Sequence, residues 1–395
     1  KNVIQSFGEL ATAWRDKSRA FVVALTGSNG KTTVKEMLAS IFEQQGSVLA
    51  TRGNLNNNIG VPLTLTRLQD EQYAVIEMGA NHAGEIHDLS LMTKPEVALL
   101  NNAGRAHLEG FGSEEGIARA KAEILYGLSR DGAFICHGDS KWLPLWKKLS
   151  AGHRMETFGE AAHCDVRVLD TTVKTHWDEH GFRQRFRIFI RGHEIEAEVP
   201  LAGRHNRMNA TAAIAVAVES GIPEEIAVFG LKFVTPVRGR LFPLVTETGM
   251  RVIDDSYNAN PESVAAAIRV LTELGGNSVL VLGDRAERGE ERRDRLLLVM
   301  HRDHDRQVGR HLGRHLGMQC GPRRWNDHTL LAGKGLLALA IEKEADVDGL
   351  LRLDDLGLAV AGPADHLEQG VRHRARGRKG DLHLQVGVVL DHGRK

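Results

Sequence analysis

The chain has 395 residues, which is enough for two or three domains, each with its own core. Lys+Arg and Asp+Glu number 51 each, so overall charge favours neither nucleic acid nor an anionic membrane as partner. Any site for an anionic ligand must therefore be local. Cys136, Cys164 and Cys320 lie far apart without metal-binding spacing, and there is no signal peptide and no apolar run of about 18 residues. These features predict structural thiols in a soluble cytoplasmic protein without membrane insertion.

Short apolar runs alternate with helical patterns in the first part of the chain. Val34, Met37, Leu38 and Ile41 share one helical face, and residues 113–128 also have a helical pattern. The predicted buried strands are residues 20–26, 73–78, 97–100 and 133–136. This alternation indicates βαβ units and a mostly parallel sheet, the α/β class.

Residues 182–199 have a different pattern. Arginines alternate with apolar residues in 182–190, and a turn at Gly192-His193 leads into 194–199, which predicts an antiparallel hairpin. A helix is expected over 204–219, and Thr235-Pro236 suits a linker. The hairpin, helix and strand predicted after it open a second, partial Rossmann-like α/β domain; they span 241–255, 262–274 and 278–282.

The C-terminal part differs in composition. No Phe or Tyr follows Tyr257, and residues 301–395 hold nine of the 19 histidines. A metal site lacks ligand spacing there, and a nucleic-acid tail is disfavoured by interspersed acidic residues. We prefer the hypothesis that residues 292–395 are a non-native segment, such as a frame-shifted translation. At the other end, the start at Lys1 suggests the middle of a longer protein.

A glycine loop follows the first predicted strand and opens a helix. Its residues are Gly27, Ser28, Asn29, Gly30, Lys31, Thr32 and Thr33. Backbone N–H groups and a helix N-terminus suit phosphate, Lys31 suits the β- and γ-phosphates, and the Thr32 hydroxyl suits Mg²⁺. The spacing is G-x-x-G-K-T, because Leu25 stands where the longer phosphate-loop pattern has its first glycine. The alternative is a chance turn before a helix.

Three further residues are candidates, each with an ordinary structural alternative. Glu77 ends a strand beside the loop, where an acid would bind Mg²⁺ or be a solvated carboxylate. His107 follows the strand 97–100, as a ligand or a structural loop histidine, and Lys121 on a helix has the pattern of a surface lysine.

Two polar segments are compatible with either a structural role or a ligand-binding role. Asn54–Asn58 is either a turn-rich loop or a substrate-contacting one. The segment 254–261 ends a strand and starts a helix at Pro261, which fits either a helix cap or a ligand crevice.

Taken together, these residues resemble the Mur ligase family, over roughly residues 5–291. The segments that carry the resemblance are TGSNGKTTVKEM, GNLNNNIGVP, AVIEMGANHAGEI, AHLEGFGS, ARAKAEI, GRHNRMNA, GRLFP and DDSYNANP. GKTT is shared with folate ligases, whereas GNLNNNIGVP and DDSYNANP are more specific to the branch that adds D-alanyl-D-alanine.

The resemblance implies a site for ATP and Mg²⁺. Lys31 and Thr32 would hold phosphate and metal, Glu77 and His107 would complete the metal site, and Lys121 would be carried as a carbamate. It also places Asn206 and Asn209 near the adenine and makes Arg240 and Asp255 nucleotide contacts of a later domain.

The implied reaction joins D-alanyl-D-alanine to UDP-N-acetylmuramoyl-tripeptide through an acyl phosphate, in a monomer that binds no nucleic acid. Its implied organisation is a linker (1–18) from a missing N-terminal domain, an ATP-binding domain (19–234), the start of a ligase domain (235–291) and the atypical 292–395. Another Mur or folylpolyglutamate-type ligase, an inactive ATP-binding fragment and a regulatory NTPase switch are the alternatives.

Overall fold

The computed structural model describes residues 2–104, 108–245, 251–257, 261–275, 277–284, 301–302, 330–333, 336–341 and 384–392. The chain divides into two compact units. The first comprises Lys1–Val173 and Arg183–Thr235, and the second comprises Lys174–Phe182 and Pro236–Lys395.

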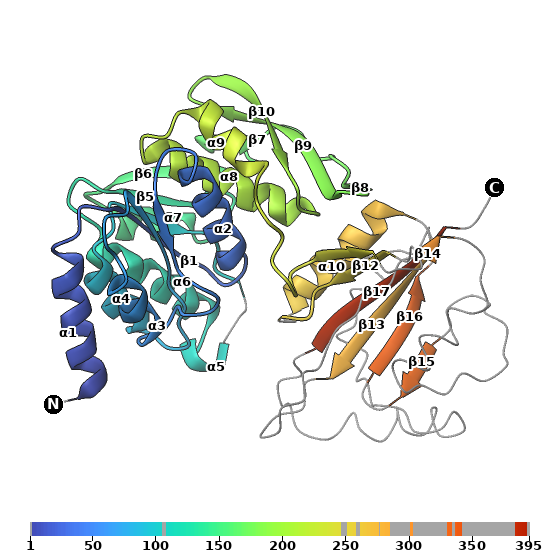
Figure 1. Ribbon diagram of the computed structural model, residues 1–395, viewed down its shortest axis with the longest axis horizontal. Helices are drawn as coiled ribbons and strands as arrows, with labels where there is room; N and C mark the ends of the chain where they lie inside the picture. The colour runs from blue at the N-terminus through green and yellow to red at the C-terminus, as the bar shows by residue number, and fades with distance from the viewer. Residues whose placement is uncertain are drawn as a thin grey trace. The chain divides into compact units, whose positions relative to one another are not determined.

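The larger sheet, most of which lies in the first unit, has the strand order β10-β9-β7-β6-β5-β4-β1-β3-β2, and β8 pairs with β9 (Figure 1). Strands β1 to β7 pair with one another in parallel, whereas β9 is antiparallel to both β7 and β10. The strands are β1 (Phe21–Thr26), β2 (Val48–Ala50), β3 (Tyr73–Glu77), β4 (Val97–Leu100), β5 (Ala133–His137), β6 (Arg154–Gly159), β7 (Val166–Val168), β8 (His176–Asp178), β9 (Gly181–Ile190) and β10 (His193–Val199).

Helices cover both faces of this sheet, as expected where crossovers join parallel strands (Figure 1). One face packs against α2 (Lys31–Phe42), α8 (Arg204–Glu219) and α9 (Glu224–Leu231). The other is covered by α1 (Val3–Arg15), α3 (Gly60–Leu65), α4 (Glu85–Thr93), α6 (Glu114–Ala122), the 3₁₀ turn η1 (Glu123–Gly127) and α7 (Leu143–Leu149). A one-turn helix α5 (Leu108–Phe111) precedes α6.

Alternation along β1 explains how one apolar run serves two cores. Val23 and Leu25 pack in the core with α2 and α8, whereas Val22 and Ala24 pack in the opposite core. All four are fully buried, because successive side chains of a strand point to opposite faces. A continuous apolar run is therefore the pattern of a strand with both faces covered.

The predicted hairpin of β9 and β10 is confirmed, with its turn one residue earlier than the expected Gly192-His193. Arg191 and Gly192 link the strands with φ of 48° and 92°, so both lie in the left-handed region that a tight two-residue turn uses. The arginines of β9 point outward, while Gln184, Phe186 and Ile188 are buried. Gln184 donates to Leu201 O at 2.5 Å and accepts from Arg207 at 2.6 Å, which satisfies its buried amide.

The second unit contains the predicted hairpin and helix, followed by further strands. Its sheet has the order β11-β12-β17-β13-β16-β15, with β14 paired to β17. The elements are β11 (Phe242–Val245), β12 (Arg251–Asp254), α10 (Pro261–Leu274), β13 (Asn277–Asp284), β14 (His301–Arg302), β15 (Leu330–Gly333), β16 (Leu336–Ile341) and β17 (Leu384–His392).

The α/β class is confirmed, and the mostly parallel sheet is that of the first unit. In the second unit the described pairings are antiparallel except for β14 with β17. The pairs β11–β12 and β15–β16, which are each consecutive along the chain, are antiparallel. The hypothesis that residues 292–395 are non-native stays a prediction.

Candidate active site

The phosphate loop joins β1 to α2 and is held by two asparagines that follow β4. Asn102 accepts from the Asn29 N–H at 2.9 Å and donates to the Asn29 carbonyl at 2.9 Å. Asn101 donates to the same carbonyl at 3.1 Å. Because β1 and β4 are parallel neighbours, their carboxyl ends meet at one edge of the sheet. The loop is thus braced by the protein's own side chains.

Gly30 is the position in the loop where only glycine fits. Its φ is +79°, and a Cβ there would lie 2.5 Å from Asn209 Oδ1 and 2.8 Å from Asn101 Nδ2. The two amides also bond to each other at 3.1 Å. The absence of a side chain therefore lets α2 begin at Lys31 against the amides, with its first N–H groups directed at the loop.

Lys31 and Thr32 lie at the start of α2. The Lys31 ammonium donates to the Gly27 carbonyl at 2.7 Å and to the Ser28 carbonyl at 3.4 Å, so its charge lies over the loop. Thr32 is buried and Thr33 is half-buried. A cation at the N-terminus of a helix is suited to polyphosphate.

Glu77 ends β3, next to β1, with only 1% of its surface exposed. Asn56 donates to its Oε1 at 2.8 Å, and its own N–H donates to Thr51 Oγ1 at 2.9 Å. Its Oε2 is buried and has no hydrogen-bond partner among the described residues. A buried carboxylate oxygen left without a donor fits a metal ligand better than the solvated carboxylate we had also considered.

The asparagine-rich loop has a positioning role. Asn56 holds Glu77, and Asn57 Oδ1 accepts from the N–H groups of Ile59 and Gly60 at 3.1 and 2.9 Å, where α3 starts. These contacts account for two of the asparagines without any substrate.

Lys121 lies at the end of α6 and is 2% exposed, so the interpretation as a surface lysine was wrong. Burial, together with the nearby charge of Lys31, lowers the pKa of Lys121 to about 7. The Phe111 ring lies 5.4 Å from its Nζ. Lys31 and Lys121 therefore lie close enough to repel, and Lys121 is partly neutral at physiological pH.

Asn206 and Asn209 are buried on α8 and connect the helix to the phosphate loop. Asn209 donates to Asn206 Oδ1 at 3.0 Å, and Asn206 donates to the Ala202 carbonyl at 2.8 Å. Through Asn101 the series of hydrogen bonds reaches Asn29. Both amides thus position the loop, besides the adenine contact that the resemblance implies.

Arg240 and Asp255 lie together in the second unit. The Arg240 guanidinium stacks over Tyr257 at 4.3 Å, and Asp255 Oδ1 accepts from the Leu241 N–H at 3.1 Å. Burial raises the pKa of Asp255 to about 7, against the opposing effects of that hydrogen bond and of Arg240. His107 lies outside the described residues.

Sequence reasoning missed the residues that support the site. Asn101, Asn102 and Thr51 were not singled out, although Asn101-Asn102 directly follows the strand VALL. Polar residues at the carboxyl end of a strand that neighbours the phosphate-loop strand were the available signal.

A glycine loop between strand and helix of a doubly wound sheet, a lysine over it and a buried carboxylate on the adjacent strand define a nucleotide-phosphate-binding protein. Comparison with known proteins gives the family. The Mur ligase middle domain matches residues 25–217, and the Mur ligase, glutamate ligase domain matches residues 239–306. The chain belongs to the Mur ligase family.

Individual relatives point to one branch. The UDP-N-acetylmuramoyl-tripeptide–D-alanyl-D-alanine ligase of Escherichia coli (strain K12) is 46% identical over 294 residues, which cover 74% of this chain and 64% of that protein. The Bacillus subtilis (strain 168) ligase of the same name is 38% identical, over 73% of this chain and 61% of that protein.

Solved structures agree with these relatives. MurF from Acinetobacter baumannii has a TM-score of 0.66 at 38% identity, over 70% of this chain and 59% of that one. The Thermotoga maritima MurF ligase in complex with ADP has a TM-score of 0.62 at 27% identity, over 70% and 62%. The chain therefore spans less than two thirds of the length of these relatives. Within the described residues, no helix is both long and apolar enough to cross a bilayer.

Proposed function

We propose that the chain catalyses the ATP-dependent joining of D-alanyl-D-alanine to UDP-N-acetylmuramoyl-tripeptide, through an acyl phosphate. The relatives that carry this name support the choice of substrates. The observation that carries the chemistry is the buried Glu77 oxygen, which has no hydrogen-bond partner among the described residues and lies on the strand beside the phosphate-loop strand. The buried amine of Lys121, whose pKa burial and the charge of Lys31 lower to about 7, supports it.

The site residues fit Mg-ATP. The loop Gly27–Thr33 and Lys31 would hold the phosphates, and Thr32, Glu77, His107 and a modified Lys121 would hold Mg²⁺. The buried Oε2 of Glu77, without a donor among the described residues, is what an oxygen-preferring cation needs. When bound, Mg²⁺ would offset the charge that develops on the γ-phosphoryl group.

Lys121 is suited to carbamylation because its pKa is about 7. A neutral amine adds to CO₂, forms an N–C bond and releases a proton, which leaves a carbamate anion. This change replaces a group that repels a cation with an oxygen ligand. It also removes the repulsion between Lys31 and Lys121.

The protein's own residues would then position two displacements. The tripeptide carboxylate attacks the γ-phosphorus, and the bond to ADP breaks while Lys31 and the loop N–H groups stabilise the charge. The amine of D-alanyl-D-alanine attacks the acyl carbon, loses a proton and expels phosphate. Phosphorylation is needed because a free carboxylate is a poor electrophile.

The remaining predicted residues complete the nucleotide site in this proposal. Asn206 and Asn209 would contact the adenine side, and Arg240 and Asp255 would contribute from the ligase domain. The proposal places the protein in the cytoplasm, where ATP is available, as a monomer.

The test measures phosphate release by the full chain with ATP, UDP-N-acetylmuramoyl-tripeptide and D-alanyl-D-alanine. We expect release only with both substrates, together with a new amide-linked product by mass spectrometry. Lys31→Ala should lower turnover by about 10²- to 10³-fold, the usual effect of removing one group that stabilises the transition state. Release with a folate and glutamate instead would identify a folylpolyglutamate-type ligase, and ATP binding without release would identify a fragment that only binds nucleotide.

A further inference from the structure

A second group of side chains of the kinds that can bind a metal lies at the same edge of the first sheet, beyond β4. Asp139 follows β5, and His163 and Cys164 lie in the segment between β6 and β7. One potential ligand atom of each lies within 4.8 Å of those of the other two. Spacing along the chain did not reveal Cys164 as a ligand, because Asp139 is 25 positions away and only the pairing of β5 with β6 brings them together.

Asp139 is held as an oriented carboxylate. Its Oδ2 accepts from the Glu160 N–H at 2.7 Å, and its Oδ1 accepts from the Ala161 N–H at 3.0 Å. Oδ2 keeps a further lone pair, so the group remains able to bind a cation.

His163 is oriented by the backbone. Its Nε2 lies 3.0 Å from the Gly138 carbonyl, which can only accept, so Nε2 carries the hydrogen. In the neutral ring the other nitrogen then has a free lone pair. A backbone carbonyl bound to one ring nitrogen is the common partner of a histidine that binds metal through the other.

Cys164 is 4% exposed, and its thiol contacts Asp139 Oδ1 at 3.6 Å. Glycines border this contact. A Cβ at Gly138 would lie 2.5 Å from the sulfur, and a Cβ at Gly159 would lie 2.7 Å from both the sulfur and Asp139 Oδ2. Because Gly159 has no side chain, nothing from that residue lies between the Cys164 sulfur and the Asp139 carboxylate.

His137 adds a fourth group beside these three. Its Nε2 lies 3.9 Å from Asp139 Oδ2, and this nitrogen is buried without a hydrogen-bond partner among the described residues.

We propose that Asp139, His163 and Cys164 bind a Zn²⁺ ion, with water at the fourth position. A sulfur, a nitrogen and an oxygen donor suit this borderline-soft cation, whereas Mg²⁺ prefers oxygen ligands. The S–H bond breaks as the sulfur–zinc bond forms, and the proton leaves to solvent. Two anionic ligands then neutralise the ion, which suits a thiol that is buried.

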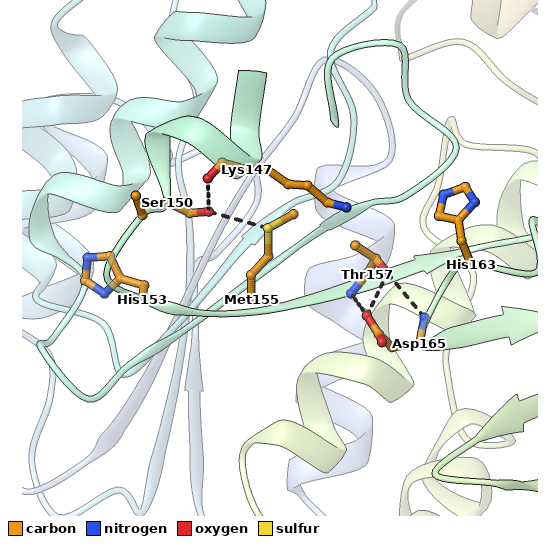
Figure 2. A pocket seen from close by; sticks show the side chains of 8 residues that line it. Lys147, Ser150, His153, Met155, Thr157, His163 and Asp165 are labelled. Atoms are coloured by element: carbon orange, nitrogen blue, oxygen red, sulfur yellow. Dashed lines mark hydrogen bonds between the residues drawn. The ribbon is translucent and has the colours of Figure 1, made fainter. Parts of the chain in front are cut away.

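Asp139 and His163 are exposed, so an ion can reach the site from solvent. His163 also lines a pocket of about 470 Å³ between α7 and β6, together with Lys147, His153, Thr157 and Asp165 (Figure 2). The ion would tie the end of β5 to the segment before β7, so it should stabilise the folded state in proportion to its binding.

The test titrates Co²⁺, a spectroscopic substitute for Zn²⁺, into the reduced full chain without ATP. We expect one equivalent to produce a thiolate-to-cobalt charge-transfer band that Zn²⁺ abolishes. Cys164→Ser should remove the band, and Asp139→Asn and His163→Gln should each weaken Co²⁺ binding at least tenfold. The affinity should rise about tenfold per pH unit around neutrality, because one proton is released.

Matched controls come from the same part of the fold. Cys136→Ser removes a different buried thiol, which lies on β5, and His153→Gln removes a histidine of the same pocket. Both should keep the band, and Zn²⁺ should raise the melting temperature of both but not of Cys164→Ser. A band that survives Cys164→Ser, or no thiolate band at all, would overturn the proposal. If Cys164→Ser does not fold, the more exposed Asp139 and His163 variants decide.

Discussion

Lys121 is a cation in the unfolded chain and, above about pH 7, an amine in the folded one. Its position in the sequence was found through resemblance, but its burial was not, because the helical pattern around it did not reveal which face is covered. Glu77 was likewise located, and the unpaired oxygen that argues for a metal could be seen only with Asn56 and Thr51 in place.

Replacing Lys121 by Met should change how stability depends on pH. The folded-state pKa of about 7 lies below the ordinary 10.5, so between these values the unfolded chain binds more protons and the free energy of unfolding rises with pH. From about pH 7.5 to about pH 9, in CO₂-free buffer, the wild type should gain about 2 kcal/mol more than Lys121→Met. Urea unfolding at several pH values measures this, and equal slopes for the two proteins would contradict the buried amine.

At the scale of elements, the strand–loop–helix of the phosphate site was predictable because its signals are local. An apolar run, glycines and a lysine at a helix start all lie within residues 20–33. The partners that hold the loop, Asn101, Asn102 and Asn209, come from elsewhere in the chain. Their role depends on β1 pairing with β4 and on α8 packing across the sheet.

Gly30 and Gly53 both have positive φ, but only Gly30 has close neighbours, so alanine at the two positions distinguishes the effect of backbone strain from that of a steric clash. Gly30→Ala would add backbone strain and also a clash, since its Cβ would lie 2.5 Å from Asn209 Oδ1. We therefore expect the affinity for ATP to fall more than tenfold. Gly53 has φ of +55°, and a Cβ added there would meet nothing within 4 Å, so Gly53→Ala should cost only about 1 kcal/mol through strain. Calorimetric ATP titration and thermal melting compare the two variants, and equal ATP affinities would refute the bracing role.

At the scale of the whole molecule, the first unit is a complete doubly wound sheet, whereas the second is only partly accounted for by family resemblance. The glutamate ligase domain match ends at residue 306, while the second sheet also contains β15, β16 and β17 from later residues. In that sheet β17 lies between β12 and β13. Whether residues 292–395 belong to the native protein therefore decides what the second domain is.

Sequencing of the coding DNA tests the non-native hypothesis directly. We expect another reading frame downstream of Asp284 to restore alternating strand and helix patterns like those of the Mur ligase third domain. Should the present frame prove the sole open one there, the hypothesis is wrong, and the antiparallel sheet with β17 becomes the second domain of this protein.

The sequence by itself determined the fold class, the phosphate loop and the family, because these depend on local patterns and on motifs in a fixed order. Only the tertiary structure decided that Lys121 is buried, that Glu77 has an unpaired oxygen among the described residues and that Asp139, His163 and Cys164 meet. Those properties arise from strand pairing and helix packing between residues distant in the chain, and no local pattern encodes the resulting desolvation or proximity.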